Sequence, residues 1–198
     1  FKEGEGPVFN NPIRNIEAIA NLPSFDPQEL SYVYKCVSNI RGALPTSLPL
    51  IGFCGSPWTL AAYSIEGGSS KDFAFTRNFI SENPKETQHL LGVYTDACFE
   101  YLKEQVLAGI DAIQIFDSWA GLLGKEGYKV FSLNYINNLV QQLKEDDVTK
   151  DTPVIIFARQ PKGGIEQLSA CKPECISLYW DESIEDSIHI LKGNTAIQ

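Results

Sequence analysis

Leu48-Pro-Leu-Ile-Gly-Phe-Cys54, followed at once by Gly55-Ser56-Pro57, is the stretch that decides the fold. Its first seven residues form a short, mostly apolar run without polar alternation, which is typical of a strand covered on both faces in a parallel sheet. Ser56 and Pro57 then supply a helix cap and a first-turn proline, so a helix is predicted directly after the strand. The stretch indicates one strand–helix unit of an α/β protein.

The same unit repeats along the chain. Upstream, Asp26, Pro27 and Glu29 predict the start of a helix that ends near Gly42. Downstream, apolar residues at helical spacing lead repeatedly into short apolar runs. The five predicted strands are 48–54, 111–116, 153–158, 175–180 and one that begins within 194–198. Strands that alternate with helices predict an α/β fold with a parallel sheet, and both an open doubly wound sheet and a section of a barrel fit this pattern.

The opening of the chain, residues 1–22, is rich in Gly, Pro and Asn, and we interpret it as a connection rather than an element. The chain contains no Met and begins with Phe1, while its last residues, 194–198, resemble the start of a strand. We therefore expect it to be an internal piece of a longer protein.

Composition narrows the class of protein. At 198 residues and 22.0 kDa the chain can form one domain with a hydrophobic core. Its net charge of −9, with no cluster of Lys or Arg, argues against binding to nucleic acid or to an anionic membrane. No apolar run is long enough to cross a bilayer. Five Cys in unpaired spacings, with no signal segment, indicate a reducing cytoplasm.

Candidate functional residues follow the predicted strands, because parallel α/β folds bind ligands at the carboxyl ends of strands. The helix that Ser56 caps has free amides near its start that could bind an anion, although a helix cap and nothing more is the simpler and preferred interpretation of Ser56. Tyr63 lies about two turns further along this helix. Its hydroxyl could reach the carboxyl ends of the strands, or Tyr63 could be a core residue. Ser118 follows a buried strand and suits a hydrogen-bond donor better than a nucleophile, since no nucleophile elbow surrounds it.

Three further features have simpler interpretations. The segment 66–71 is glycine-rich but lacks the spacing of a phosphate-binding loop, so we expect a flexible loop. Cys171 and Cys175 have no second pair to complete a zinc tetrad, which indicates a structural role. Arg159 ends a predicted strand and could hold an anion or form a surface ion pair.

The long stretch Pro49 to Gly68 resembles the uroporphyrinogen decarboxylase family, and shorter motifs in the same order extend the resemblance along the whole chain. These motifs are Glu3–Pro7, Gly109–Gly121, Phe131–Tyr135 and Pro153–Phe157. The resemblance implies a (β/α)8 TIM barrel, of which this chain covers roughly strands 3 to 7. Residues 1–198 would then form a single domain, a partial TIM barrel that lacks the first two strands and the C-terminal part.

The resemblance also implies an activity. The family's carboxy-lyase converts uroporphyrinogen III to coproporphyrinogen III in haem biosynthesis by removing four acetate carboxyls, without metal or organic cofactor, and it forms a homodimer. Tyr63 and Ser118 match substrate-contacting positions, and Phe53 and Phe116 match aromatic residues that line the cleft. Gly55 would allow close approach of the macrocycle.

The family's catalytic Asp, its Arg-rich segment and its His match no position here, so we expect no catalytic residue within this chain. Five strands cannot close a barrel, and we expect the chain by itself to be inactive and prone to aggregation. Two positions depart from the family pattern: Gln160-Pro-Lys162 interrupts a usually Gly-rich stretch, and Tyr179 stands where an Asp is common before Trp180.

Two alternatives remain open from the residues. One is a non-catalytic tetrapyrrole-binding barrel, which would keep the pocket without the chemistry. The other is a zinc-dependent methylcobamide methyltransferase relative, which carries His-x-Cys where this chain has Phe157 and Arg159. Those two side chains cannot hold zinc, so the second alternative is the weaker one.

Overall fold

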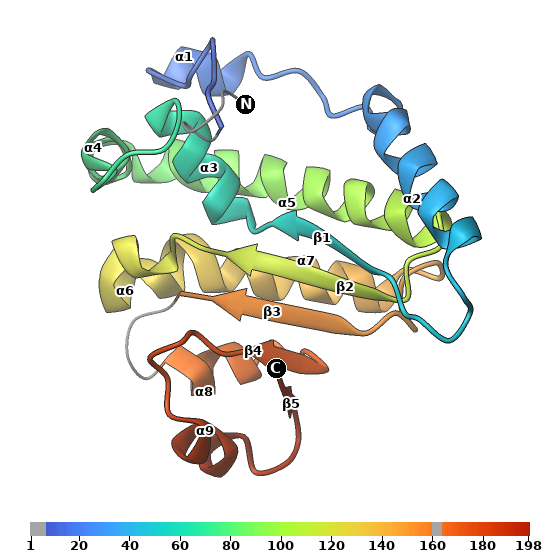
Figure 1. The fold of residues 1–198 in the computed structure, drawn as a ribbon. Helices are drawn as coiled ribbons and strands as arrows, with labels where there is room; N and C mark the ends of the chain where they lie inside the picture. Colours follow the sequence, from blue (N-terminus) through green and yellow to red (C-terminus); the bar gives the residue numbers. More distant parts are fainter. Residues whose placement is uncertain (1–6, 160–163) are drawn as a thin grey trace.

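The computed structural model describes residues 7–159 and 164–198. Its centre is a parallel sheet whose strands lie in the order β1-β2-β3-β4-β5 (Figure 1). The strands are β1 (Ile51–Gly55), β2 (Ala112–Asp117), β3 (Val154–Ala158), β4 (Cys175–Ser177) and β5 (Ala196–Ile197). All five predicted strands are confirmed, although the fourth ends earlier than the sequence indicates.

Helices fill the connections between these strands. The helical segments are α1 (Ile16–Ala20), η1 (Pro27–Leu30), α2 (Ser31–Ala43), α3 (Pro57–Glu66), α4 (Ala74–Glu82), α5 (Pro84–Leu107), η2 (Ala120–Leu123), α6 (Gly124–Tyr128), η3 (Lys129–Leu133), α7 (Asn134–Glu145), α8 (Gly164–Ser169) and α9 (Ile184–Leu191). Of these, η1 and η2 are 3-10 helices and η3 is a π-helical turn between α6 and α7.

The order of the strands decides between the two topologies that the sequence leaves open. Each strand pairs with the strand that follows it in the chain, whereas a doubly wound sheet reverses its order at a switch point. The observed order is that of an arc of a (β/α) barrel. The carboxyl ends of all strands therefore meet at one edge, where the candidate residues lie.

One face of the sheet packs on α5 and α7. Ile113 and Ile115 of β2 are completely buried there, against Leu102 of α5 and Leu139 of α7. Alternate residues of each strand point to the other side, which we call the open face of the sheet. In β1 this alternation leaves Phe53 60% exposed while its neighbour Cys54 is buried. The open face corresponds to the interior of a closed barrel.

The sequence analysis was wrong about the opening segment, which contains a helix rather than only a connection. Asn15 caps α1 by accepting a hydrogen bond from the amide of Ala18, and Ile19 is buried in a second apolar cluster with residues of α3. Arg14 then donates to the carbonyls of Ile65 and Glu66 at the end of α3. A single turn stabilised by such distant partners gives too short a periodic pattern to be predicted.

The predicted caps are confirmed. The hydroxyl of Ser56 accepts the amide of Thr59, and the carboxylate of Asp26 accepts the amide of Gln28, at the starts of α3 and η1. Among the described residues, no helix has both the length and the apolar character needed to cross a membrane.

Candidate active site

A row of aromatic side chains crosses the open face near the carboxyl edge of the sheet. The ring of Phe53 meets that of Phe116 edge-on at 5.8 Å, Phe116 lies 5.9 Å from Phe157, and Phe157 lies 6.2 Å from Tyr179. The register explains the row, because Phe116 of β2 pairs directly with Phe157 of β3. The row forms an apolar wall that brings Phe53 and Phe116 together, and their role in lining a substrate cleft stays a prediction.

Tyr63 belongs to a neighbouring aromatic cluster at the same edge. Its ring makes edge contacts at 5.9 Å with Phe73 and with Trp119, whose own rings lie 4.4 Å apart. Trp119 directly follows Ser118, so the structure brings α3 together with the loop that carries Ser118. The sequence analysis missed Phe73 and Trp119 as partners of Tyr63, because the contacts join segments far apart in the chain.

Gly55 lies where β1 turns into α3 and pairs with Phe116. A Cβ atom at this position would approach the side chain of Leu60 to 3.2 Å and that of Thr59 to 3.5 Å. The protein's own packing therefore gives a reason for a glycine here. Close approach of a macrocycle at Gly55 stays a prediction.

Asp117 ends β2 and is completely buried on the helix side of the strand. Its carboxylate accepts hydrogen bonds from the hydroxyls of Ser56 at 2.7 Å and Thr59 at 3.3 Å, and from the hydroxyl of Ser132 in η3. Burial raises the pKa of Asp117 from 3.8 to about 6, and the three hydroxyl donors oppose that rise. Its negative charge also raises the pKa of Tyr128, after the larger effect of burial.

This carboxylate changes the interpretation of the start of α3. The amide of Thr59 is already capped by Ser56, and Asp117 places a negative charge against the same turn. A helix N-terminus that faces a buried carboxylate is poorly suited to bind a second anion. The capping role of Ser56 is thus the one that the geometry supports.

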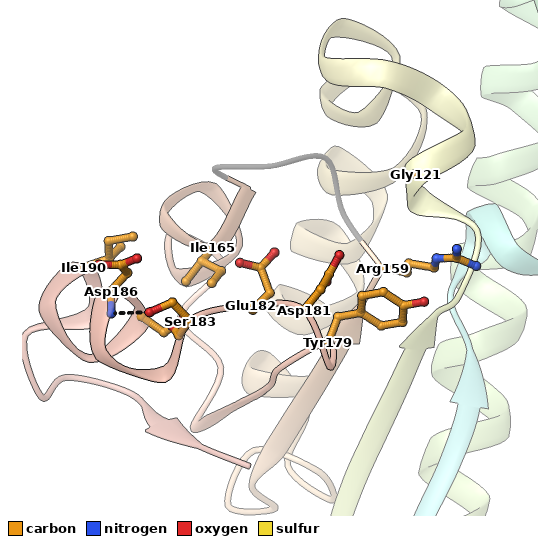
Figure 2. A pocket seen from close by; sticks show the side chains of 10 residues that line it. Gly121, Arg159, Ile165, Tyr179, Asp181, Glu182, Ser183, Asp186 and Ile190 are labelled. Atoms are coloured by element: carbon orange, nitrogen blue, oxygen red, sulfur yellow. Dashed lines mark hydrogen bonds between the residues drawn. The ribbon is translucent and has the colours of Figure 1, made fainter.

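Arg159 follows β3 and borders a cavity of about 460 Å³ beside α9 (Figure 2). Its guanidinium lies 5.1 Å from the centre of the Tyr179 ring, a cation–π contact. Asp181, Glu182 and Asp186 line the same cavity, while the guanidinium of Arg159 lies beside Tyr179 and points away from Asp181 and Glu182 (Figure 2). The departure at Gln160-Pro-Lys162 lies outside the described residues.

The described residues near the end of β3 do not form a metal site. At the end of β3, Phe157 and Arg159 occupy the positions where the zinc-dependent alternative needs His and Cys. In the part of the chain that the structure describes, no three His, Cys, Asp or Glu side chains cluster in a way that could hold a metal ion.

Comparison with known proteins gives the family. A family model described as Uroporphyrinogen decarboxylase (URO-D) matches residues 1–198. This chain belongs to the uroporphyrinogen decarboxylase family. Curated relatives of that name include one from Acinetobacter baumannii (strain ACICU), 40% identical over 199 residues, and one from Hydrogenovibrio crunogenus (strain DSM 25203 / XCL-2), 40% identical over 201 residues. In both cases the match covers all of this chain but only 56% of the relative, so the chain spans about half the length of these uroporphyrinogen decarboxylases.

A solved structure described as a methyltransferase from Methanosarcina mazei has a similar fold. It matches with a TM-score of 0.76 over 96% of this chain and 53% of that one, at 13% sequence identity. At that identity the similarity concerns the fold alone. It agrees with an arc of a barrel for this member of the uroporphyrinogen decarboxylase family.

Two residues of the aromatic wall were missed by the sequence analysis as lining residues, namely Phe157 and Tyr179. A signal was present for Phe157, because it lies an even number of residues from Ile155 and shares the half-buried face of β3 with it. The same alternation was present for Tyr179, which lies two residues after Ser177, the last residue of β4, and contacts Phe157.

Proposed function

We propose that the native-length protein, meaning this chain with any sequence that flanks it in its natural gene, is a uroporphyrinogen decarboxylase. It would convert uroporphyrinogen III to coproporphyrinogen III in haem biosynthesis, without metal or organic cofactor. In each of the four steps an acetate side chain takes up one proton and releases carbon dioxide, which leaves a methyl group. The observation that carries the proposal is the family match over every residue of the chain.

The geometry supports a role in substrate binding for the residues within this chain. The wall of Phe53, Phe116 and Phe157 offers an apolar surface of the kind that packs against flat organic rings. Tyr63 and Ser118 lie on adjoining segments, and their hydroxyls could donate to carboxylates or accept from pyrrole N–H groups. Gly55 would allow the macrocycle to approach the backbone at the edge of this wall.

The catalytic groups would come from elsewhere in the native-length protein. Protonation of a pyrrole ring creates a cation, so the reaction requires an anion near the pyrrole NH groups and cations near the propionates. Asp117 cannot supply that anion, because it is completely buried on the helix side of β2. Arg159 borders a cavity whose other charged lining residues, Asp181, Glu182 and Asp186, are acidic, and it is not proposed as the propionate-binding cation.

The proposal also covers the location and the oligomeric state of the protein. We propose a cytoplasmic homodimer as the working form, and an inactive, aggregation-prone chain when residues 1–198 are prepared alone. The five strands leave β1 at an edge of the described sheet, where Ile51 is 42% and Phe53 60% exposed. Such an apolar edge favours association between chains.

The experiment is an anaerobic assay of the native-length protein with uroporphyrinogen III, in which the products are separated by their number of carboxyl groups. Tyr63→Phe and Ser118→Ala should each lower kcat/KM by on the order of fivefold or more, because each removes one hydrogen bond of about 1 kcal/mol. Tyr135→Phe is the matched control, since its hydroxyl already donates to the carbonyl of Gln88.

The outcomes separate the alternatives. Formation of coproporphyrinogen, with losses in the two variants but not in the control, supports the proposal. Tight binding of uroporphyrinogen without any product would favour the non-catalytic tetrapyrrole-binding barrel instead. Activity that depends on added zinc and a methylcobamide would favour the methyltransferase relative.

A further inference from the structure

We propose that Asp117 is a positioning residue of the candidate active site, which holds Ser118 in place by tying the end of β2 to the first turn of α3. The proposal rests on the proposed function, because it assigns to Ser118 the role of a substrate hydrogen-bond donor. Asp117 itself never touches substrate in this scheme. It acts through its neighbour in the chain.

The Asp117 side chain is held by several partners. It points away from the open face, is completely buried, and accepts hydrogen bonds from three hydroxyls on two different elements. Two of the donors, Ser56 and Thr59, belong to the start of α3, and the third, Ser132, belongs to the π-helical turn η3. A buried carboxylate with three donors is a rigid anchor, since moving it would leave charge or hydroxyls unpaired.

On the other side of Ser118 in the chain, Trp119 is also held in place. The indole nitrogen of Trp58 donates to the carbonyl of Trp119 at 2.9 Å, and Trp58 is completely buried. The Trp119 ring packs against Phe73 at 4.4 Å. Ser118, which is only half-buried, therefore lies between two residues that are each fixed by the same turn of α3, at positions 56–59.

Backbone hydrogen bonds also connect the ends of β1, β2 and β3 next to Asp117. The amide of Ser56, just after β1, donates to the carbonyl of Phe116 at 2.8 Å, and the amide of Arg159, just after β3, donates to the carbonyl of Asp117 at 3.1 Å. The ends of three adjacent strands thus meet at Asp117. The charge of Asp117 also raises the pKa of Tyr128 in α6, after the larger effect of burial. A helical irregularity such as η3 often accompanies functional sites, and here it carries the Ser132 donor.

The test is a double-mutant cycle in the native-length protein, with uroporphyrinogen III as the probe. Asp117→Asn keeps the size of the side chain but replaces one acceptor oxygen by a donor, so the hydroxyls can no longer all be satisfied. We expect kcat/KM to fall on the order of tenfold in the wild-type background. In the Ser118→Ala background the same substitution should change kcat/KM by less than about twofold, because the group that it positions is already gone.

A matched control separates positioning from general destabilisation. Thr149 is also completely buried, and its hydroxyl donates to the carbonyl of Leu143 in another part of the fold. Thr149→Val should weaken the fold and leave kcat/KM unchanged in both backgrounds. Equal losses from Asp117→Asn with and without Ser118 would overturn the proposal. So would an unchanged kcat/KM for Ser118→Ala in an enzyme that does turn over substrate, although the proposed function would then stand.

Hydrogen exchange gives a readout that needs no activity. Asp117→Asn should raise the exchange rates of backbone amides in 118–121 while those of Val154–Ala158 in β3 stay the same. Ser132→Ala, which keeps the carboxylate and removes one donor, should do so more weakly and serves if Asp117→Asn fails to fold. Unchanged exchange at 118–121 would refute the anchoring role. Failure of the proposed function would appear differently, as absence of product from the wild-type protein itself.

Discussion

The buried carboxylate of Asp117 predicts a specific dependence of stability on pH. Burial raises its pKa from 3.8 to about 6 in the folded protein, while the unfolded chain exposes it to water and restores the ordinary value. The folded state therefore binds the proton more tightly than the unfolded state does. The contribution of Asp117 to stability is fully present below pH 3.8 and is lost as the pH rises through about 6.

The magnitude follows from the size of the rise. At about 1.4 kcal/mol for each pH unit, an increase from 3.8 to about 6 corresponds to about 3 kcal/mol of unfolding free energy. About 2 kcal/mol of this falls between pH 4.5 and 7.5, a range in which many proteins stay folded. Because Asp117 is completely buried, solvent screening does not reduce the figure as it would for a surface group.

The assay is urea unfolding of the native-length protein, followed by tryptophan fluorescence at several pH values, for the wild type and for Asp117→Asn. Other groups titrate in both proteins, so the difference between the two curves isolates Asp117. We expect the free energy of unfolding of the wild type, relative to the variant, to decrease by about 2 kcal/mol from pH 4.5 to 7.5. A difference that stays constant with pH, or that increases, would refute the reasoning.

Three further predictions concern the fold and the chemistry. Leu139→Ala should lower the free energy of unfolding by about 2–5 kcal/mol, because Leu139 is completely buried between α7 and the sheet, and a urea titration without such a loss would contradict this packing. Gly109→Ala should cost about 1–2 kcal/mol, since Gly109 has a φ of +103° and a Cβ there would lie 3.0 Å from Arg41, whereas Gly42→Ala in the open helical site of α2 should stabilise by roughly 0.5–1 kcal/mol. EDTA should leave the decarboxylase rate of the native-length protein unchanged, and loss of activity that zinc restores would overturn the metal-free chemistry.

Local features of the structure follow from the sequence because their signals are local. The cap at Ser56, the proline at 57 and the apolar residues of β1 lie next to one another in the chain, and the structure has a strand and a helix there. The same holds for the capped start at Asp26, which leads into η1 and α2. The short helix α1 was missed, since its stability comes from Ile19 packing on a distant helix rather than from its own pattern.

The candidate site was predicted only in part for a similar reason. Phe53 and Phe116 were named from a family resemblance alone, whereas Tyr63 and Ser118 were also named from their places after predicted strands. The structure adds which of these residues adjoin. The hydrogen bond between Ser56 and Asp117 joins residues 61 positions apart, and no periodicity in the sequence reports such a pair. The row from Phe116 to Phe157 likewise needs the register of two strands before it can be seen.

By itself the sequence determined the class of fold, the number of strands and their places along the chain, and the family, because apolar patterning, caps and long motifs are properties of neighbouring residues. The tertiary structure decided that consecutive strands pair into an arc of a barrel, that Asp117 is buried on the helix side rather than in the open face, and that one turn of α3 fixes both neighbours of Ser118. These outcomes depend on which face of each strand meets the helices. That choice is made by the packing of the whole core, since burial lowers the free energy only when distant apolar and polar groups find their partners together.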